Sequence, residues 1–296
     1  PVVMDFVGET LSWRHVEGAL EVELHRAPLN EIGTTTLDEL EVLAGYVRDG
    51  ASGARAMILW SSRPGFCAGA DLRELHAGFV ERRSEQVGRL QGVVGSGPTG
   101  RVLARGLQRA ARPVIRREIR SFIRRIHAVM DTLDTAPMTT IAATHGVVFG
   151  GGFELALTAD LIVAEKSARF CFPELRLGIV PGFGGIPRLE RDLGNALVRD
   201  LLLTGRSLNA RRAHAAGLVS QVVPKGEGLA AARRIAAQAG KFDAHTTARA
   251  KSFLKPLPSS RLEEEQRLFC DLVLRPEVFE ALEAFVTNDS AQPYLP

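Results

Sequence analysis

The chain has 296 residues, of which 45% are hydrophobic and 24% charged, with a formal net charge of +3. This composition is ordinary for a globular protein with a sizeable core, and the charge is too small to indicate nucleic-acid binding. No apolar stretch reaches about 18 residues and the first ten residues contain no basic segment, so neither a membrane span nor a secretory signal is expected. Three cysteines without paired spacing (Cys67, Cys171 and Cys270) argue against a disulfide framework or a zinc site and favour a reducing cytoplasm.

The first sixty residues show clear patterns. LSWRHVEG (11–18) and ALEVELH (19–25) predict a hairpin that turns at Glu17-Gly18. A helix is predicted to begin near Thr34–Thr36, because apolar residues follow at helical spacing. AMILWS (56–61) predicts a short buried strand.

The next part of the chain is harder to interpret. Residues 76–112 are poorly patterned, and GVVGSGPTG (92–100) predicts a flexible loop. A long helix is predicted to start at Pro113, with apolar residues at a period near 3.6, and to stop before Pro137.

Arginines gather between Arg101 and Arg125, where there is one acid, Glu118. Their spacing of three or four would place most of them on one side of a helix, in two pieces separated by Pro113. A solvated helix face is the favoured interpretation, and a site for phosphate or another polyanion is the alternative. The arginines are those at 101, 105, 109, 112, 116, 117, 120, 124 and 125.

The second half predicts an α/β protein. Strands are expected at 139–146, 161–165 and 168–172, with a helix from Phe153 between the first two. After Gly185 the pattern becomes helical, interrupted by one strand at 217–223. Short strands alternating with helices favour an α/β fold with a helical C-terminal third.

Two glutamates beside glycine-rich or proline-marked turns are the most informative feature. Glu154 follows three glycines, and Glu174 follows Pro173 shortly before PGFGG (181–185). Burial and mutual repulsion can separate the pKa values of two such carboxyl groups, which suits an acid/base pair. Glycines let backbone N–H groups approach a ligand closely. The pattern therefore indicates an enzyme that acts beside a carbonyl group.

Four segments carry a family resemblance. SRPGFCAGADLREL (62–75), GVVFGGGFELALTADLIVA (146–164), ARFCFPELRLGIVPGFGGIPRL (168–189) and AAGLVSQVV (215–223) resemble the enoyl-CoA hydratase/isomerase, or crotonase, family. The resemblance implies a spiral of ββα units with a helical C-terminal trimerisation region, a homotrimer or homohexamer, and acyl-CoA thioesters as substrates. No metal or redox cofactor is implied, and coenzyme A is part of the substrate.

The implied domain organisation has a crotonase-like spiral core over 1–205, with an enlarged connection at 76–112, and a helical C-terminal region over 206–296. The stretch between Leu72 and Pro137 is longer than the connection usual in the family. It could reshape or cover the acyl pocket, or be a solvent-exposed elaboration.

The resemblance places an oxyanion hole on the backbone N–H groups of Ala70 and Gly151. Physical reasoning supports the second, because a helix N-terminus beside Gly151 favours negative charge. Glu154 matches the hydratase residue that orients and activates a water, and Glu174 the residue that transfers a proton at the α-carbon. Gly182 is expected to offer its N–H group to the same water.

Binding of coenzyme A is implied at Ala68 and Ala70, whose backbone would pair with the adenine, and at Arg26, which would meet the phosphates. Asp71 is expected to cap the helix that starts at Leu72. Phe66 and Cys67 are expected to pack rather than react, and His145, where the family commonly has asparagine, to be a structural hydrogen-bonding residue.

The leading hypothesis is an enoyl-CoA hydratase that acts reversibly on a 2-enoyl-CoA thioester. A Δ3,Δ2-enoyl-CoA isomerase that uses mainly Glu174 is the close alternative, and dehydration, carbon–carbon cleavage or ring opening of acyl-CoAs are others. A non-catalytic RNA-binding protein that uses the arginines of 101–125 is the hypothesis from a different class. Glu154, Glu174 and the oxyanion-hole positions argue against this last hypothesis.

Overall fold

The computed structural model describes residues 6–91 and 99–287, with the side chains of 82–91 and 99–114 excepted. Its main sheet has seven strands in the order β1-β2-β3-β4-β5-β7-β10. The strands β1 to β3 pair antiparallel, and all pairs from β3 onward are parallel. The bounds are β1 Phe6–Val7, β2 Leu11–Val16, β3 Ala19–Leu24, β4 Ala56–Ser61, β5 Thr139–Thr144, β7 Leu161–Glu165 and β10 Gln221–Val223.

A second, three-stranded sheet carries the glycine turn. It consists of β6 (Val147–Phe149), β8 (Arg169–Cys171) and β9 (Leu208–Asn209), with β6 parallel to β8 and β8 antiparallel to β9. β9 was not predicted from the sequence, and β10 is shorter than the strand expected at 217–223.

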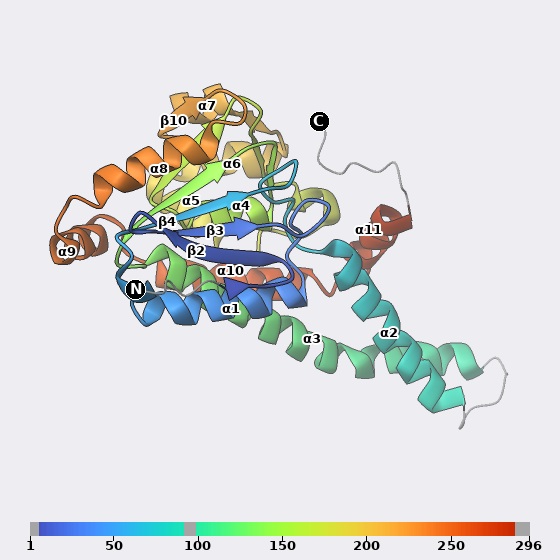
Figure 1. The fold of residues 1–296 in the computed structure, drawn as a ribbon. Helices are drawn as coiled ribbons and strands as arrows, with labels where there is room; N and C mark the ends of the chain where they lie inside the picture. The colour runs from blue at the N-terminus through green and yellow to red at the C-terminus, as the bar shows by residue number, and fades with distance from the viewer. Residues whose placement is uncertain (1–5, 92–98, 288–296) are drawn as a thin grey trace.

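Helices cover both faces of the main sheet (Figure 1). Apolar residues of α1 and of the second half of α3 are buried on one face, and those of α8 lie on the other with the core residues of β4, β5 and β7. The mixed α/β architecture expected from the sequence is therefore confirmed. The helices are α1 Thr34–Arg48, α2 Leu72–Gln91, α3 Thr99–Asp134, α4 Gly151–Ala156, α5 Gly185–Leu193, α6 Asn195–Thr204, α7 Ala210–Ala215, α8 Gly228–Ala239, α9 Ala244–Leu254, α10 Ser259–Leu272 and α11 Pro276–Thr287, with 3-10 turns at Ala51–Gly53 (η1) and Glu174–Leu177 (η2).

The N-terminal patterns are confirmed. β2 and β3 form the expected hairpin, in which Glu17 (φ 50°) and Gly18 (φ 82°) adopt the positive φ values that a two-residue turn requires. The helix expected from Thr34 is α1, and its apolar stripe is buried in the core. The strand expected at 56–61 is β4.

The interpretation of residues 76–112 was wrong. This stretch is helical: α2 runs from Leu72 to Gln91, and α3 begins at Thr99 and continues through Pro113 for 36 residues. The arginine stripe therefore lies on one helix and is not broken at Pro113. Proline inside a helix costs about 3 kcal/mol because it lacks an N–H group, but α2 packs against α3 and supports it.

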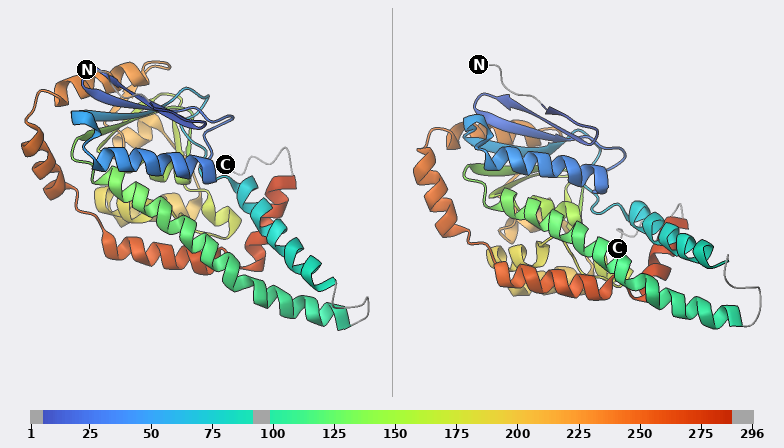
Figure 2. Two further views of the ribbon diagram at one scale, coloured as in Figure 1. Left: turned by 60° about the horizontal axis from the view of Figure 1, so that its bottom comes forward. Right: turned by 90° about the horizontal axis from the view of Figure 1, so that it is seen from below.

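Together α2 and α3 project from the body of the molecule as a helical arm (Figures 1 and 2). The loop expected at 92–100 falls largely on 92–98, which lie outside the described residues, and Thr99 already belongs to α3. Among the described residues, no helix has the length and apolar character that a bilayer crossing requires.

Candidate active site

Three glycines after β6 let the chain make a tight turn into α4. Gly150 has φ 49° and donates its N–H to Cys171 O at 2.9 Å, and α4 begins at Gly151, two residues earlier than predicted. A β-carbon at Gly152 would lie 2.3 Å from Cys67 O, so only glycine fits this contact between α4 and the loop of residues 62–71.

The turn brings the Gly151 backbone next to that of Ala70. A β-carbon at Gly151 would lie 3.4 Å from the Ala70 nitrogen, and one at Gly69 (φ 105°) would lie 3.2 Å from the Gly151 nitrogen. The hydrogen bonds found in the described part of the chain use neither the Ala70 N–H nor the Gly151 N–H. Two adjacent donors are thus available for an oxygen, and one of them is at the N-terminus of α4.

Glu154 is buried in α4 and faces the PGFGG turn. Its Oε1 accepts hydrogen bonds from Phe183 N and Gly185 N, each at 2.8 Å. Burial raises the pKa of Glu154 to about 7, although these peptide groups, the Arg188 charge and the Gly182 N–H oppose the rise. A carboxyl group with this pKa exchanges protons near neutral pH.

Glu174 is the first residue of η2, and its side chain lies beside the glycine turn at Gly150. Its Oε1 would lie 2.7 Å from a β-carbon at Gly150, and its Oε2 is buried with no hydrogen-bond partner among the described residues. Burial, and then the nearby charge of Glu154, raise the pKa of Glu174 well above its usual value. Both carboxyl groups of the pair therefore keep a proton to higher pH than a solvated glutamate does.

Gly182, expected to position a water, lies beside Glu154. Its N–H is among the peptide groups that act on the Glu154 carboxylate, and its carbonyl accepts a hydrogen bond from His127 Nε2 at 2.9 Å. A β-carbon there would lie 2.5 Å from the Phe269 ring, which explains the glycine. The predicted residues Ala70, Gly151, Glu154, Glu174 and Gly182 are all brought together, but their roles stay predictions.

The proposed coenzyme A residues lie at one edge of this site. Arg26 pairs with Asp71 at 2.6 Å and also bonds the Glu31 carbonyl, while Ala68 N donates to Leu29 O at 2.9 Å. The Arg26 side chain is 28% exposed, so it remains accessible to a phosphate. Coenzyme A binding by Arg26, Ala68 and Ala70 stays a prediction.

Several structural expectations are confirmed. Asp71 Oδ1 accepts from Glu74 N at 2.9 Å, as a cap of α2 should. Phe66 and Cys67 are fully buried, and burial raises the pKa of the Cys67 thiol to about 12, so it packs and does not react. His145 Nε2 bonds Arg63 O at 2.7 Å, which is a structural contact.

Two of the described arginines of α3 pair with acidic residues of the same chain. Arg116 is 3.5 Å from Asp271, and Arg125 binds Glu41 at 2.7 Å and also Asp38. Binding of a polyanion would compete with these contacts. The side chains of the four arginines from 101 to 112 lie outside the described residues.

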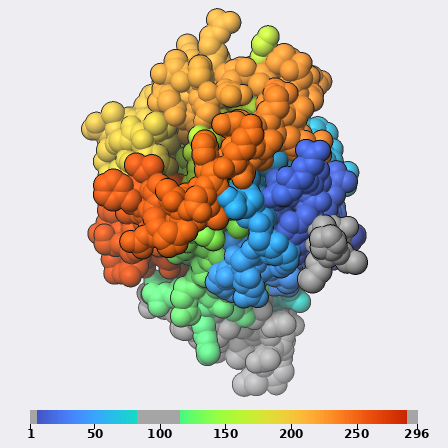
Figure 3. Space-filling view, turned by 60° about the vertical axis from the view of Figure 1, so that its left-hand side comes forward, coloured from blue at the N-terminus to red at the C-terminus, as the bar shows by residue number. Residues whose placement is uncertain are grey.

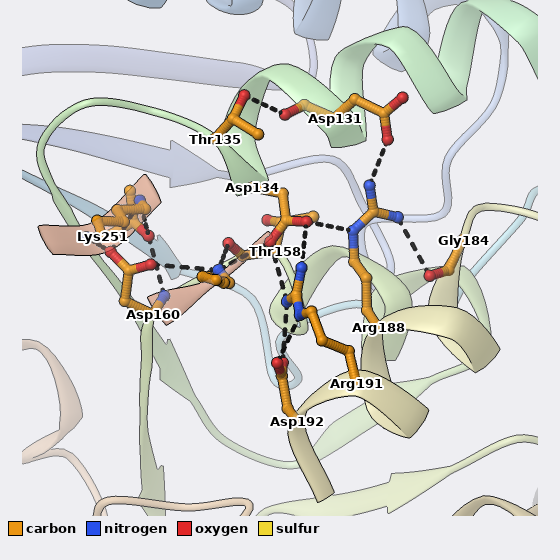
Figure 4. A network of polar contacts seen from close by, with 12 residues as sticks. Asp131, Asp134, Thr135, Thr158, Asp160, Gly184, Arg188, Arg191, Asp192 and Lys251 are labelled. Carbon is orange, nitrogen blue, oxygen red and sulfur yellow. Dashed lines mark hydrogen bonds and ion pairs between the residues drawn. The ribbon is translucent and has the colours of Figure 1, made fainter. Parts of the chain in front are cut away.

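A buried charge network behind the site was not predicted (Figure 4). Asp134 lies at its centre and contacts Arg188 Nε at 3.1 Å, Arg191 Nη1 at 2.8 Å and Lys255 Nζ at 2.8 Å. These residues come from α3, from α5 and from the residue after α9. The partners are far apart in the sequence, so no local spacing of residues could have predicted these pairs.

Comparisons with known proteins agree with the resemblance. A family model described as enoyl-CoA hydratase/isomerase matches residues 85–291. The probable enoyl-CoA hydratase echA8 of Mycobacterium tuberculosis is 39% identical over 157 residues, which are 52% of this chain and 61% of that protein. The match thus spans less than two thirds of that relative.

A longer match is found with a probable enoyl-CoA hydratase of Rhizobium meliloti, which is 32% identical over 270 residues, 89% of either chain. Among solved structures, that of a putative enoyl-CoA hydratase from Streptomyces avermitilis superposes with a TM-score of 0.75 at 22% identity, covering 96% of this chain and 93% of the other. This last similarity concerns the fold alone.

Proposed function

The chain belongs to the enoyl-CoA hydratase/isomerase family, and from this premise we propose that it is an enoyl-CoA hydratase that adds water reversibly across the double bond of a 2-enoyl-CoA thioester. One observation carries the proposal: two buried carboxyl groups, Glu154 and Glu174, lie at the glycine turn beside two backbone N–H groups that have no acceptor among the described residues. Hydration needs both a base and an acid, and an isomerase needs one carboxylate.

In the proposed reaction, ionised Glu154 takes a proton from water while the water oxygen bonds to the β-carbon. Gly182 N–H helps to hold this water. The raised pKa of Glu174 favours its protonated form, which can give a proton to the α-carbon. The product is a 3-hydroxyacyl-CoA, with Glu154 protonated and Glu174 ionised until the two exchange protons.

Negative charge that develops on the thioester oxygen would be stabilised by the N–H groups of Ala70 and Gly151. These donors are fixed before the reaction, because the turn around Gly150 and the contact of Gly152 with Cys67 determine their positions. A preorganised donor of this kind contributes about a hundredfold or more in rate. The adenine and phosphates of coenzyme A would bind at Ala68, Ala70 and Arg26.

The proposal includes a homotrimer or homohexamer. α9 buries no residue of its own, and Phe253 and Leu254 at its end are 84% and 76% exposed. Figure 3 shows the face of the molecule that the orange segment containing α9 crosses. Neighbouring exposed apolar side chains of this size are typical of interfaces between subunits.

The test is to incubate the purified protein with crotonyl-CoA and with longer and branched 2-enoyl-CoAs and to follow the loss of the conjugated chromophore. Glu154→Gln and Glu174→Gln are each expected to lower kcat by about a hundredfold or more, since each removes a proton-transfer group. Glu264→Gln is the control, because Glu264 is about half exposed and pairs only with Arg261 among described residues.

Wild-type rates in both active-site variants would contradict the proposal. If only Glu174→Gln is inactive, and a 3-enoyl-CoA is the better substrate, the chain is a Δ3,Δ2-enoyl-CoA isomerase instead.

A further inference from the structure

Two buried carboxylates hold alternate peptide groups of the turn formed by residues 182–186. Glu154 Oε1 accepts from Phe183 N and Gly185 N. Glu265, on α10, accepts from Gly184 N through Oε1 at 2.6 Å and from Ile186 N through Oε2 at 3.0 Å. Four successive N–H groups are therefore bound by two side chains from distant parts of the sequence.

The carbonyl groups of the same turn are held as firmly. His127 Nε2 donates to Gly182 O at 2.9 Å. Arg188 Nη1 donates to Phe183 O at 3.3 Å and to Gly184 O at 3.1 Å, and its guanidinium is fixed by Asp134. The turn cannot shift without breaking hydrogen bonds to buried charged groups, and such bonds are costly to break.

Glu265 is buried and has no direct part in the proposed chemistry. Its residue is 5% exposed, and both of its oxygens are used by peptide groups. Burying a carboxyl group costs several kcal/mol unless its hydrogen bonds are satisfied. In the described contacts this carboxyl group holds the backbone of residues 184–186, which belongs to the turn that also binds Glu154.

We propose that Glu265 is a positioning residue for the reaction: by holding Gly184 N and Ile186 N it directs Phe183 N and Gly185 N at Glu154. This inference rests on the proposed function, in which Glu154 activates the water. It gives α10, which contributes no reacting group, control over the catalytic base.

The charged and titratable groups that face Glu265 are Glu154 from α4, Arg188 from α5 and His127 from α3. Burial, and then the charge of Glu154, raise the pKa of Glu265, while Arg188 opposes the rise. His127 Nε2 is 4.0 Å from Glu265, but burial lowers the pKa of His127 to about 4, so it is neutral near pH 7. The charge of Glu154 therefore favours the protonated form of Glu265, while the N–H groups of Phe183 and Gly185 lower the pKa of Glu154.

Two variants disturb the hydrogen bonds of Glu265 in different ways. Glu265→Gln keeps the side-chain size but leaves one oxygen acceptor for two N–H groups. Glu265→Asp keeps both oxygens but is one methylene too short to reach both N–H groups. Glu264→Gln, on the same helix and about half exposed, is the matched control.

For Glu265→Gln we expect kcat to fall about ten- to a hundredfold, since small misplacements of reacting groups have such effects. KM should change little, because the proposed coenzyme A residues are not part of this turn. The N–H groups of Phe183 and Gly185 lower the Glu154 pKa, so their displacement should move the acidic limb of the kcat/KM profile to higher pH. Glu265→Asp should lose kcat similarly and shift the limb in the same direction.

A Glu265→Gln enzyme with the kcat and pH profile of Glu264→Gln would overturn the inference. If Glu265→Gln does not fold, Glu265→Asp decides, and an unchanged kcat in it is equally contradictory.

A second readout does not depend on activity. In protein labelled with ¹³C at glutamate carboxyl groups, an NMR titration should show a higher pKa for Glu154 in Glu265→Gln than in the wild type, because the N–H groups that lower this pKa are displaced. A wild type that hydrates no enoyl-CoA contradicts the proposed function alone, and this titration then still tests the link between the two carboxyl groups.

Discussion

Three glutamates of the site are buried although burial disfavours their charged forms. Burial is the largest influence on the pKa of Glu154, Glu174 and Glu265, and it raises all three. Groups that destabilise the folded chain in this way are typical of catalytic sites, where activity is obtained at the expense of stability. The cost in stability can be measured by substituting single residues.

Glu154→Gln should stabilise the protein in a pH-dependent manner. The pKa of Glu154 is about 7 in the folded chain against 4.5 for an ordinary glutamate side chain, so the unfolded chain loses this proton first as pH rises. Wild-type stability should therefore fall between these pH values and stay reduced above 7, by on the order of 3 kcal/mol. Glutamine does not titrate and avoids this loss.

Urea unfolding of both proteins at pH 5 and pH 8 measures the effect. The difference in unfolding free energy between the variant and the wild type should favour the variant more at pH 8 than at pH 5. A difference in unfolding free energy that is the same at both pH values would contradict the shifted pKa.

The sequence predicts Glu154 and Glu174 because each lies beside glycines that mark a turn, and a family pattern supports them. It does not predict Glu265, which stands in the run LEEEQ (262–266) after two other glutamates. Local pattern cannot distinguish the buried glutamate from Glu263 and Glu264, because the N–H groups that bind it are about 80 residues away in the chain. His127 and Arg188 were missed for the same reason.

At the scale of elements, prediction succeeded where a helix packs on the core. The stripes of α1 and of α3 beyond Ile119 were predicted because their apolar side chains are buried. The helices of the arm were not predicted, because they pack against each other away from the core and need no full apolar stripe. Val80 in α2, for example, is 41% exposed. Pro113 wrongly indicated the start of a helix, since proline is favoured in the first turn of a helix.

The short helix α4 depends on its close approach to the loop of residues 62–71. A β-carbon at Gly152 would lie 2.3 Å from Cys67 O, so Gly152→Ala should destabilise the protein by about 1–3 kcal/mol, as overpacking does. It should also lower activity, because the Gly151 N–H would move.

Gly78→Ala in α2 is the matched control. No atom lies within 4 Å of a β-carbon at this position, so alanine should stabilise the helix by about 0.5–1 kcal/mol. Thermal unfolding of both variants provides the comparison. Equal and small effects would mean that α4 does not approach the loop as closely as described.

At the scale of the whole molecule, buried ion pairs join parts of the chain that share little apolar contact. α9 has no buried residue, yet Lys251 binds Asp160 at 2.8 Å and Lys255 binds Asp134 at 2.8 Å. Asp134 also binds two arginines of α5 (Figure 4). Burial acts to raise the pKa of Asp134, but Lys255 and the arginines outweigh it and hold the pKa below its usual value.

Asp134→Asn should cost about 3–5 kcal/mol of unfolding free energy, because it leaves buried cations without their partner. Asp192→Asn, which removes an aspartate whose side chain is 35% exposed beside Arg191, should cost less than about 1 kcal/mol. Urea unfolding at pH 7 measures both. Similar values for the two variants would show that Asp134 is not the centre of the network.

The turn of residues 182–186 is bound through its peptide groups and not through its side chains. Phe183 packs beside Gly151 and lies 6.1 Å from the Phe122 ring, yet neither carboxylate contacts the Phe183 side chain through the hydrogen bonds described. A change of side chain at this position would keep every one of those bonds. Under the proposed function, the shape of the space near Glu154 can therefore change by substitution at Phe183 while the hydrogen bonds that hold Glu154 stay the same.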